Sequence, residues 1–173
     1  MRHSLFSYVR AGVFFTLYGS VKYLPTPVGD LCRFLCLWPF VKAIKSIAIK
    51  DGATFWFPHN IVIGRNVTIN EWCFIDGYGG VEIGDCCRIA HNCSLVSEDH
   101  GFADPDTPIY RQKKVGARIR LERDVWLGCG VRVLKGVTIG EGSIIGANSL
   151  VTKNIPPYSI AVGSPARVIR KRK

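Results

Sequence analysis

The stretch that decides the fold runs from residue 121 to residue 154 and reads LERDVWLGCGVRVLKGVTIGEGSIIGANSLVTKN. An aliphatic residue recurs there at every sixth position, and the series is Leu121, Leu127, Val133, Ile139, Ile145 and Val151. The same period occurs upstream in two runs, which are Ile63, Ile69, Ile75 and Ile83, Ile89, Leu95. An α-helix repeats at 3.6 residues, so a period of six indicates a β-solenoid instead.

Two further positions of each six-residue unit carry restricted residue types. The third residue after the aliphatic one is mostly Asn, Asp or Gly, which tolerate positive φ and mark a corner; these residues are Asn66, Asn92, Asp124, Gly130, Gly136, Gly142, Asn148 and Asn154. The fourth is small, and this row is Val67, Cys73, Cys87, Cys93, Val125, Val131, Val137, Ser143 and Ser149. We predict three short strands per coil, with the aliphatic residues pointing inward. The period alone does not give the hand of the solenoid.

Charge and cysteine content limit the class of protein. The 173 residues carry a formal net charge of +10, which implies anionic partners. No helix-turn-helix, zinc-finger or RNA-binding motif accompanies the charge, which argues against nucleic acid. The seven cysteines are odd in number and form no CxxC pair, so neither a zinc ribbon nor a secreted disulfide framework is favoured. We expect reduced cysteines that fill space in a cytoplasmic protein.

Residues 1–50 form an apolar, aromatic segment that we separate from a domain at 51–173. Apolar residues recur at helical spacing before Pro25, and a second apolar run extends from Leu31 to Val41. Both runs are shorter than the roughly 18 uncharged residues that span a bilayer, and no signal-peptide cleavage site follows. Two interpretations stay open: a helix pair that packs on the domain or on a neighbouring subunit, and an interfacial segment that touches anionic lipid.

The units IGRNVT (63–68), IGDCCR (83–88), IGEGSI (139–144) and IGANSL (145–150) resemble the repeat of the hexapeptide-repeat acyltransferases. The resemblance covers about residues 57–172 and is strongest toward maltose and galactoside O-acetyltransferases and exopolysaccharide O-acetyltransferases. It implies an all-β fold, a left-handed parallel β-helix, with a homotrimer whose sites lie between subunits. Left-handed crossovers are rare, so the hand comes from the resemblance alone.

The period is lost between Leu95 and Leu121, where Pro and Gly residues predict a protruding loop at about 101–118. His100 stands at the start of this loop, and an imidazole can accept a hydroxyl proton near neutral pH. The resemblance implies that His100 is the general base of a direct transfer from acetyl-CoA to a hydroxyl. Glu98 and Asp99 would orient it or contact the acceptor; solvated surface residues are the alternative.

The sequence from Gly146 onward resembles the acetyl-CoA-binding region of the same family. The donor site implied by the resemblance consists of Cys129, Gly146, Ala147, Thr152, Lys153 and Arg170. Backbone groups of Gly146 and Ala147 would hold the pantetheine arm, and the two cations would meet the CoA phosphates. Cys129 replaces a serine that is common there. On the acceptor side the resemblance implies Asn70, Asp76 and Trp126; a two-residue insertion at 77–80 shifts the alignment of Asp76.

The leading expectation is a cytoplasmic, acetyl-CoA-dependent O-acetyltransferase of a sugar or polysaccharide precursor, without a metal; a position at the inner face of the membrane is a further hypothesis. N-acetylation of an amino-sugar nucleotide, acetylation of serine or an antibiotic, and a non-catalytic β-helix scaffold remain as alternatives. The γ-class carbonic anhydrases share this prism and bind zinc through three histidines. This chain lacks the two closely spaced histidines of that site, which argues against zinc chemistry.

Overall fold

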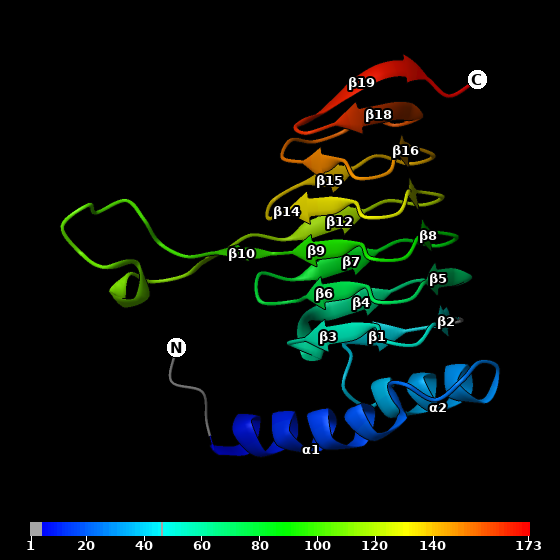
Figure 1. Cartoon of the computed structure of the whole chain (residues 1–173), viewed down its shortest axis with the longest axis vertical. Helices are drawn as coiled ribbons and strands as arrows, with labels where there is room; N and C mark the ends of the chain where they lie inside the picture. Colours follow the sequence, from blue (N-terminus) through cyan, green and yellow to red (C-terminus); the bar gives the residue numbers. More distant parts are fainter. Residues whose placement is uncertain (1–4, 46) are drawn as a thin grey trace.

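The computed structural model describes residues 5–45 and 47–173, which form a three-sided solenoid of about six turns with two helices across one end (Figure 1). The regular turns each give one strand to each of three sheets, whose strands pair in parallel except for the final antiparallel pair of sheet B. Sheet A contains β1 (Ala43–Ile44), β4 (Ile61–Ile63), β7 (Val81–Ile83), β12 (Ile119–Leu121) and β15 (Thr138–Ile139). Sheet B contains β2 (Ile47–Ile49), β5 (Val67–Ile69), β8 (Arg88–Ile89), β13 (Trp126–Leu127), β16 (Ile144–Ile145), β18 (Ser159–Gly163) and β19 (Ala166–Lys171). Sheet C contains β3 (Thr54–Trp56), β6 (Phe74–Asp76), β9 (Ser94–Val96), β14 (Arg132–Leu134) and β17 (Leu150–Val151).

The six-residue period is confirmed by the register of these sheets. Ile83 pairs with Ile63 on one side and with Leu121 on the other, so inward aliphatic residues stack from coil to coil. All residues of the predicted small row are buried as well. The thiols of Cys73, Cys87 and Cys93 each donate to a backbone carbonyl at 3.1 Å, and all seven cysteines are free. A thiol fits here because it is both small and a weak donor.

The predicted positive-φ corners occur at seven of the eight expected residues, and Asn154 is the exception. The side chain of Asn154 instead accepts the N–H of Thr138 at 2.8 Å. Trp72 and Cys86 adopt positive φ at the same position of their units, with values of 59° and 64°. Packing in the solenoid therefore imposes the corner even where the side chain does not favour it.

The predicted pair of N-terminal helices is present as α1 (Leu5–Val21) and α2 (Val28–Leu37), which lie across the open end of the solenoid (Figure 1). Phe14, Tyr18 and Leu37 join the hydrophobic core, and the Tyr18 hydroxyl donates to the Ala53 carbonyl at 3.2 Å. A solenoid needs such caps because its terminal coil has no further neighbour to cover it.

The first coil begins before residue 51, the boundary expected from the sequence. In β2, Ile47 and Ile49 pair in parallel register with Val67 and Ile69 of the next coil. Part of the segment assigned to residues 1–50 is therefore solenoid. The aliphatic series did not reveal this coil because an aromatic residue, Phe55, takes the inward position six residues after Ile49, although Gly52 provides a corner with a φ of 75°.

The predicted loop leaves the solenoid after β9 and returns before β12 (Figure 1). Its base is a short antiparallel ribbon of β10 (Glu98–Asp99) and β11 (Val115–Gly116), and its tip contains the 3-10 turn η2 (Ile109–Arg111). The other 3-10 turn, η1 (Pro58–Asn60), lies outside the loop and precedes β4. The carboxylate of Asp104 accepts the Asp106 N–H at 3.0 Å and the Thr107 hydroxyl at 2.6 Å. These bonds give the loop tip a defined shape.

Candidate active site

The predicted site residues divide between two edges of the solenoid. The loop edge follows sheet C and comprises residues 76–80, 97–118, 134–137 and 152–154; the groove edge follows sheet B and comprises residues 70–73, 90–93, 128–131 and 146–149. The loop edge carries Asp76, Asp99, His100, Thr152 and Lys153. The groove edge carries Asn70, Cys129, Gly146 and Ala147. Trp126 lies half-exposed on sheet B, and Arg170 lies on β19.

His100 directly follows β10 at the base of the loop, and its side chain is exposed. It forms no hydrogen bond or ion pair with any residue that the structure describes. Asp99 does not orient it, because the Asp99 carboxylate pairs with Lys135 Nζ at 2.8 Å. The imidazole is therefore open to a ligand at the loop edge.

A rigid polar corner lies at the base of the same loop. Asp76 is 3% exposed, and its carboxylate accepts the Tyr78 N–H at 2.8 Å. Burial raises the pKa of Asp76 and the charge of Glu98 adds to the effect, while the Tyr78 N–H and Lys114 oppose it. The buried hydroxyl of Ser97 donates to the Asp76 carbonyl at 2.6 Å and accepts the Gly79 N–H at 2.8 Å. The inserted glycine corner is thus fixed against the base of the loop.

Glu98 completes this corner with one satisfied and one unsatisfied oxygen. Its Oε1 accepts from Lys114 Nζ at 2.6 Å, which ties the outgoing and returning strands of the loop together. Its Oε2 is buried and accepts no hydrogen bond from any residue that the structure describes. A buried acceptor without a donor is costly, so a hydroxyl-bearing ligand at this corner would be stabilised by it.

Sequence reasoning missed three residues of this arrangement: Ser97, Lys114 and Lys135. Their partners lie in other coils or across the loop base, where the six-residue period carries no information. The sequence suggested Glu98 only as an orienting or acceptor-contacting neighbour of His100. Lys114 could have been found in one way: it directly precedes the returning strand of the loop, so that it can reach an acidic residue on the outgoing strand.

The groove edge opens into a cavity of about 370 Å³. Its lining is Trp72, His91, Asn92, Ser94, Cys129, Gly130, Arg132 and Asn148. The two backbone groups expected to hold a pantetheine arm differ here. The Gly146 N–H already donates to the Ala161 carbonyl at 2.8 Å, whereas the Ala147 N–H forms no hydrogen bond within the described residues. Ala147 is therefore the available donor of the two.

The two cations expected to meet phosphates are both exposed. Neither Lys153 nor Arg170 takes part in an ion pair or side-chain hydrogen bond with a described residue, so both charges are available. By contrast, Lys114 and Lys135 are engaged by carboxylates at the loop edge. Across residues 5–45 and 47–173, no three His, Cys, Asp or Glu side chains are grouped to hold a metal ion.

The sequence and the structure of this chain were both compared with those of known proteins. Residues 118–153 match the bacterial transferase hexapeptide (six repeats) family. A maltose O-acetyltransferase from Clostridium difficile 630 is 27% identical, with a TM-score of 0.87 over 98% of this chain and 90% of that one. The chain is thus similar to the hexapeptide-repeat acetyltransferases in its repeat and in its structure. Its all-β fold is the left-handed β-helix of the hexapeptide-repeat acetyltransferases, as expected from the resemblance.

Two further relatives extend this similarity. A galactoside acetyltransferase, solved in complex with coenzyme A, is 29% identical, with a TM-score of 0.85 over 100% of this chain and 86% of that one. A probable acetyltransferase of Mycobacterium tuberculosis is 38% identical over 135 residues, which is 78% of this chain and 43% of that protein. The chain spans about half the length of the curated relatives it matches.

Proposed function

We propose that this chain is an acetyl-CoA-dependent O-acetyltransferase that acts on a hydroxyl of a sugar or polysaccharide precursor. The observation that carries the proposal is the open imidazole of His100 at the loop edge, close in the chain to the unsatisfied oxygen of Glu98 and on the same edge as Asp76. A base and hydrogen-bond acceptors for a polyol thus share one edge. The similarity to sugar O-acetyltransferases, one of them solved with coenzyme A, supports the donor and the acceptor class.

In this mechanism His100 takes the proton of the acceptor hydroxyl as its oxygen attacks the thioester carbonyl of acetyl-CoA. A C–O bond forms and a tetrahedral intermediate results. When the intermediate collapses, the C–S bond breaks and the imidazolium returns the proton to the departing CoA thiolate. The products are an acetyl ester and free coenzyme A, and no acyl-enzyme is formed.

The donor would contact both edges, with Gly146 and Ala147 on the groove edge and Lys153 on the loop edge, and it would reach toward Arg170 at the end of the solenoid. The free N–H of Ala147 would donate to a carbonyl of the pantetheine arm, next to Cys129 and the backbone of Gly146. Lys153 and Arg170 form no ion pair with the described residues and would neutralise CoA phosphates. Thr152 adjoins Lys153 and would line the same path.

The acceptor would contact Asp76 and the unsatisfied oxygen of Glu98, together with Asn70 of the groove edge and Trp126 of sheet B. Asp76 is held by Tyr78 and can accept a hydrogen bond from a sugar hydroxyl. Asp99 would sit at the entrance, where its ion pair with Lys135 narrows the approach to His100.

We propose that a homotrimer completes the site, because its two halves lie on different edges of one chain. Sheet C separates Asp76 and His100 from Asn70 and Ala147. The loop also exposes large apolar side chains, with Phe102 73% and Tyr110 74% accessible, which an assembled neighbour would cover. Phe102→Ser with Tyr110→Ser should then shift the protein from trimer toward monomer in sedimentation equilibrium; unchanged mass would contradict this assembly.

The activity test follows free thiol released from acetyl-CoA in the presence of a panel of mono- and disaccharides. We expect His100→Ala to lower the rate by about 10²–10⁴-fold, the usual contribution of a general base. His59→Ala is the matched control, because His59 is also exposed but lies in η1. A full rate in His100→Ala would refute the mechanism, release only with amino sugars would favour N-acetylation, and absent CoA binding would favour a scaffold.

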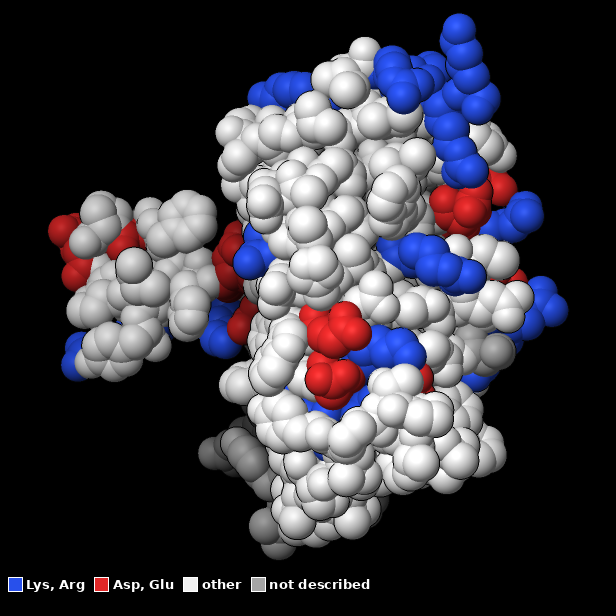
Figure 2. All heavy atoms as spheres, turned by 45° about the vertical axis from the view of Figure 1, so that its right-hand side comes forward, with Lys and Arg blue, Asp and Glu red and all other residues white. Residues whose placement is uncertain are grey.

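We also propose that the helical end contacts an anionic membrane surface at its cytoplasmic face. Val28, Leu31 and Trp38 at α2 are 68%, 60% and 59% exposed, and α1 exposes Val9 and Leu17. On the face seen in Figure 2 the described residues at this end show few charged side chains, whereas Lys and Arg gather at the opposite end. Within residues 5–45 and 47–173 there is no helix with the length and apolarity to span a bilayer. The helices would therefore lie in the interface.

Cosedimentation with phosphatidylglycerol vesicles tests this contact without deleting the first coil. Leu31→Ser with Leu35→Ser should move the protein from the pellet to the supernatant. Val168→Ser with Ile169→Ser removes comparable exposed apolar area from β19 and should leave the pellet fraction unchanged. If both double variants divide between pellet and supernatant in the same way, the membrane proposal is wrong. If the helix variant instead changes the oligomeric mass of the protein in solution, the helix face is a contact between copies of the chain.

A further inference from the structure

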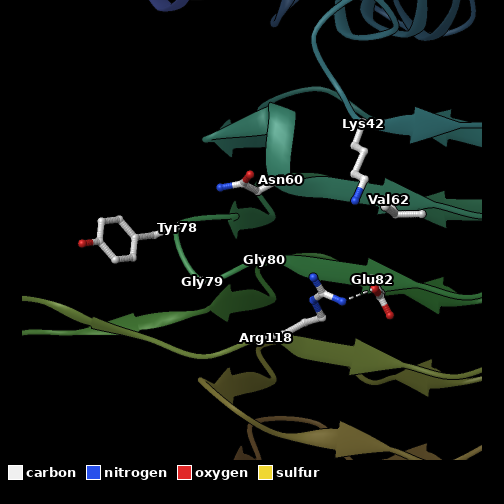
Figure 3. A pocket seen from close by; sticks show the side chains of 8 residues that line it. All are labelled: Lys42, Asn60, Val62, Tyr78, Gly79, Gly80, Glu82 and Arg118. Carbon is white, nitrogen blue, oxygen red and sulfur yellow. Dashed lines mark hydrogen bonds and ion pairs between the residues drawn. The ribbon is translucent and has the colours of Figure 1, made fainter. Parts of the chain in front are cut away.

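A second cavity, of about 170 Å³, lies on the outer side of sheet A where the glycine corner turns into β7. Its lining consists of Lys42, Asn60, Val62, Tyr78, Gly79, Gly80, Glu82 and Arg118. Lys42 reaches into it from the side of the helices and Arg118 from the side of the loop, so that the two cationic groups point toward one another (Figure 3). The ring of Tyr78 points away, and only its backbone borders the space.

The charges around this cavity do not balance. Glu82 is the one carboxylate in the lining, and it is shared: its Oε1 accepts from Arg118 at 2.7 Å and its Oε2 from Arg120 at 2.8 Å. These three groups leave one positive charge. Lys42 adds a second, since it forms no ion pair with a described residue. The amide of Asn60 also forms no side-chain hydrogen bond within the described ranges, so it can donate to a ligand.

The size of the cavity suits a single anionic group. Pockets for whole small ligands measure roughly 300–1,000 Å³, so this space would hold only part of a larger molecule. A phosphate offers several oxygens, which a lysine ammonium and an arginine guanidinium can bind together. The backbone N–H groups of Gly79 and Gly80 are already bonded to Ser97 and Gly77, so the side chains must supply the donors.

The position of the cavity indicates which substrate carries the anion. The corner that lines it begins directly after Asp76, on the loop edge where we place the acceptor. Neither cation proposed for the CoA phosphates lines this cavity: Lys153 is on the loop edge in a later coil, and Arg170 is on β19, at the opposite end of the solenoid from the helices (Figure 1). We propose that this cavity binds a phosphate of the acceptor, which makes the substrate a saccharide linked to a phosphate or diphosphate. This inference rests on the proposed acetyl transfer.

Binding of inorganic pyrophosphate to the full chain tests the inference directly. Calorimetry is run with saturating coenzyme A, and again in a Lys153→Gln, Arg170→Gln background, so that the proposed donor site does not contribute. We expect Lys42→Gln and Arg118→Gln each to raise the dissociation constant at least about tenfold, or ~1.4 kcal/mol. Lys45→Gln and Arg65→Gln are the matched controls. Lys45 is an exposed lysine three residues along, and Arg65 pairs with a carboxylate at 3.1 Å without lining the cavity.

Pyrophosphate affinity that falls equally in the controls, or does not fall in the cavity variants, would overturn the site. Geranyl diphosphate and uridine diphosphate then compete with bound pyrophosphate. Displacement by the first alone supports a lipid-linked acceptor, and displacement by the second alone supports a nucleotide-linked one. Failure of both would overturn the assignment to an acceptor. Because the binding assay in the double-variant background needs no acetyl transfer, its failure is separable from a failure of the thiol-release assay.

Discussion

Replacement of Arg33 by Met should destabilise the helical end of the solenoid far more than loss of Lys50, the other cation that pairs with Asp30. Arg33 is a residue of α2, and its side chain is fully buried. Its Nε donates to the Ile49 carbonyl at 2.8 Å and its Nη1 to the Leu24 carbonyl at 2.6 Å. Its Nη2 pairs with Asp30 at 2.8 Å. One guanidinium therefore joins the helix connection, α2 and the first coil.

The magnitude follows from the groups that Arg33→Met would leave behind. Loss of one partner from a buried ion pair costs about 3–5 kcal/mol, and each hydrogen bond from a charged donor contributes about 1.5–3 kcal/mol. Asp30 keeps Lys50 at 2.5 Å, and the Met side chain restores part of the buried apolar area. We therefore expect a loss of about 3–5 kcal/mol rather than the full sum. Lys50→Met removes a partly exposed partner of the same carboxylate and should cost about 1 kcal/mol or less.

Urea and thermal denaturation followed by far-ultraviolet circular dichroism measure both variants. At about 2–4 °C per kcal/mol for a chain of this length, Arg33→Met should lower the melting temperature by about 6–20 °C. Hydrogen exchange should rise first in α1 and α2, because the guanidinium holds them to Ile49. A loss no greater than that of Lys50→Met would refute the assignment of Arg33 as the residue that fastens the cap.

Three further predictions concern single positions in the solenoid and the cap. Burial raises the pKa of Asp76, so the folded state loses stability as pH rises from the ordinary carboxyl range through that raised pKa. Asp76→Asn should remove this loss, and urea midpoints between about pH 4 and pH 8 should show a flatter profile while acetyl transfer falls. Gly64→Ala would place a Cβ in overlap with an Asp85 carboxylate oxygen and 2.7 Å from the Asp85 backbone nitrogen, so it should cost about 1–3 kcal/mol in thermal unfolding. In α1, a Cβ added at Gly12 would have no atom within 4 Å. Gly12→Ala should therefore stabilise the folded protein by about 0.5–1 kcal/mol in the same measurement.

The repeat was predictable because each hexad has the same local structure, with one inward aliphatic residue and one tight corner. The small row was predictable for the same reason, since the residue after each corner is buried in every coil. Asn154 departs from the pattern in φ, and its amide oxygen accepts the N–H of Thr138 in the preceding coil. The first coil was missed because its inward series is mixed: Ile49 is followed six residues later by Phe55, which pairs with Ile75, although Gly52 supplies the positive-φ corner between them.

The candidate site was predictable only in part. His100 was identified through family resemblance and the loss of the period. The ion pair of Glu98 with Lys114 depends on how the returning strand of the loop pairs with the outgoing one, which no repeat encodes. The cavity between Lys42 and Arg118 joins distant parts of the sequence through the stacking of coils. Such contacts become visible only when the coil register is known.

Because each coil contacts only its neighbours, chain order becomes spatial order along the solenoid. The apolar helices lie at one end, the cavity of Lys42 and Arg118 follows, the loop with His100 comes next, and Arg170 lies at the far end (Figure 1). On the proposed function, a lipid-linked or nucleotide-linked acceptor would approach from the helical end and acetyl-CoA from the other. The two substrates would then meet at the base of the loop, where the open imidazole of His100 would face both. This order also separates the charges: the acceptor phosphate and the CoA phosphates would be held by different cations, so neither substrate competes for the other's site.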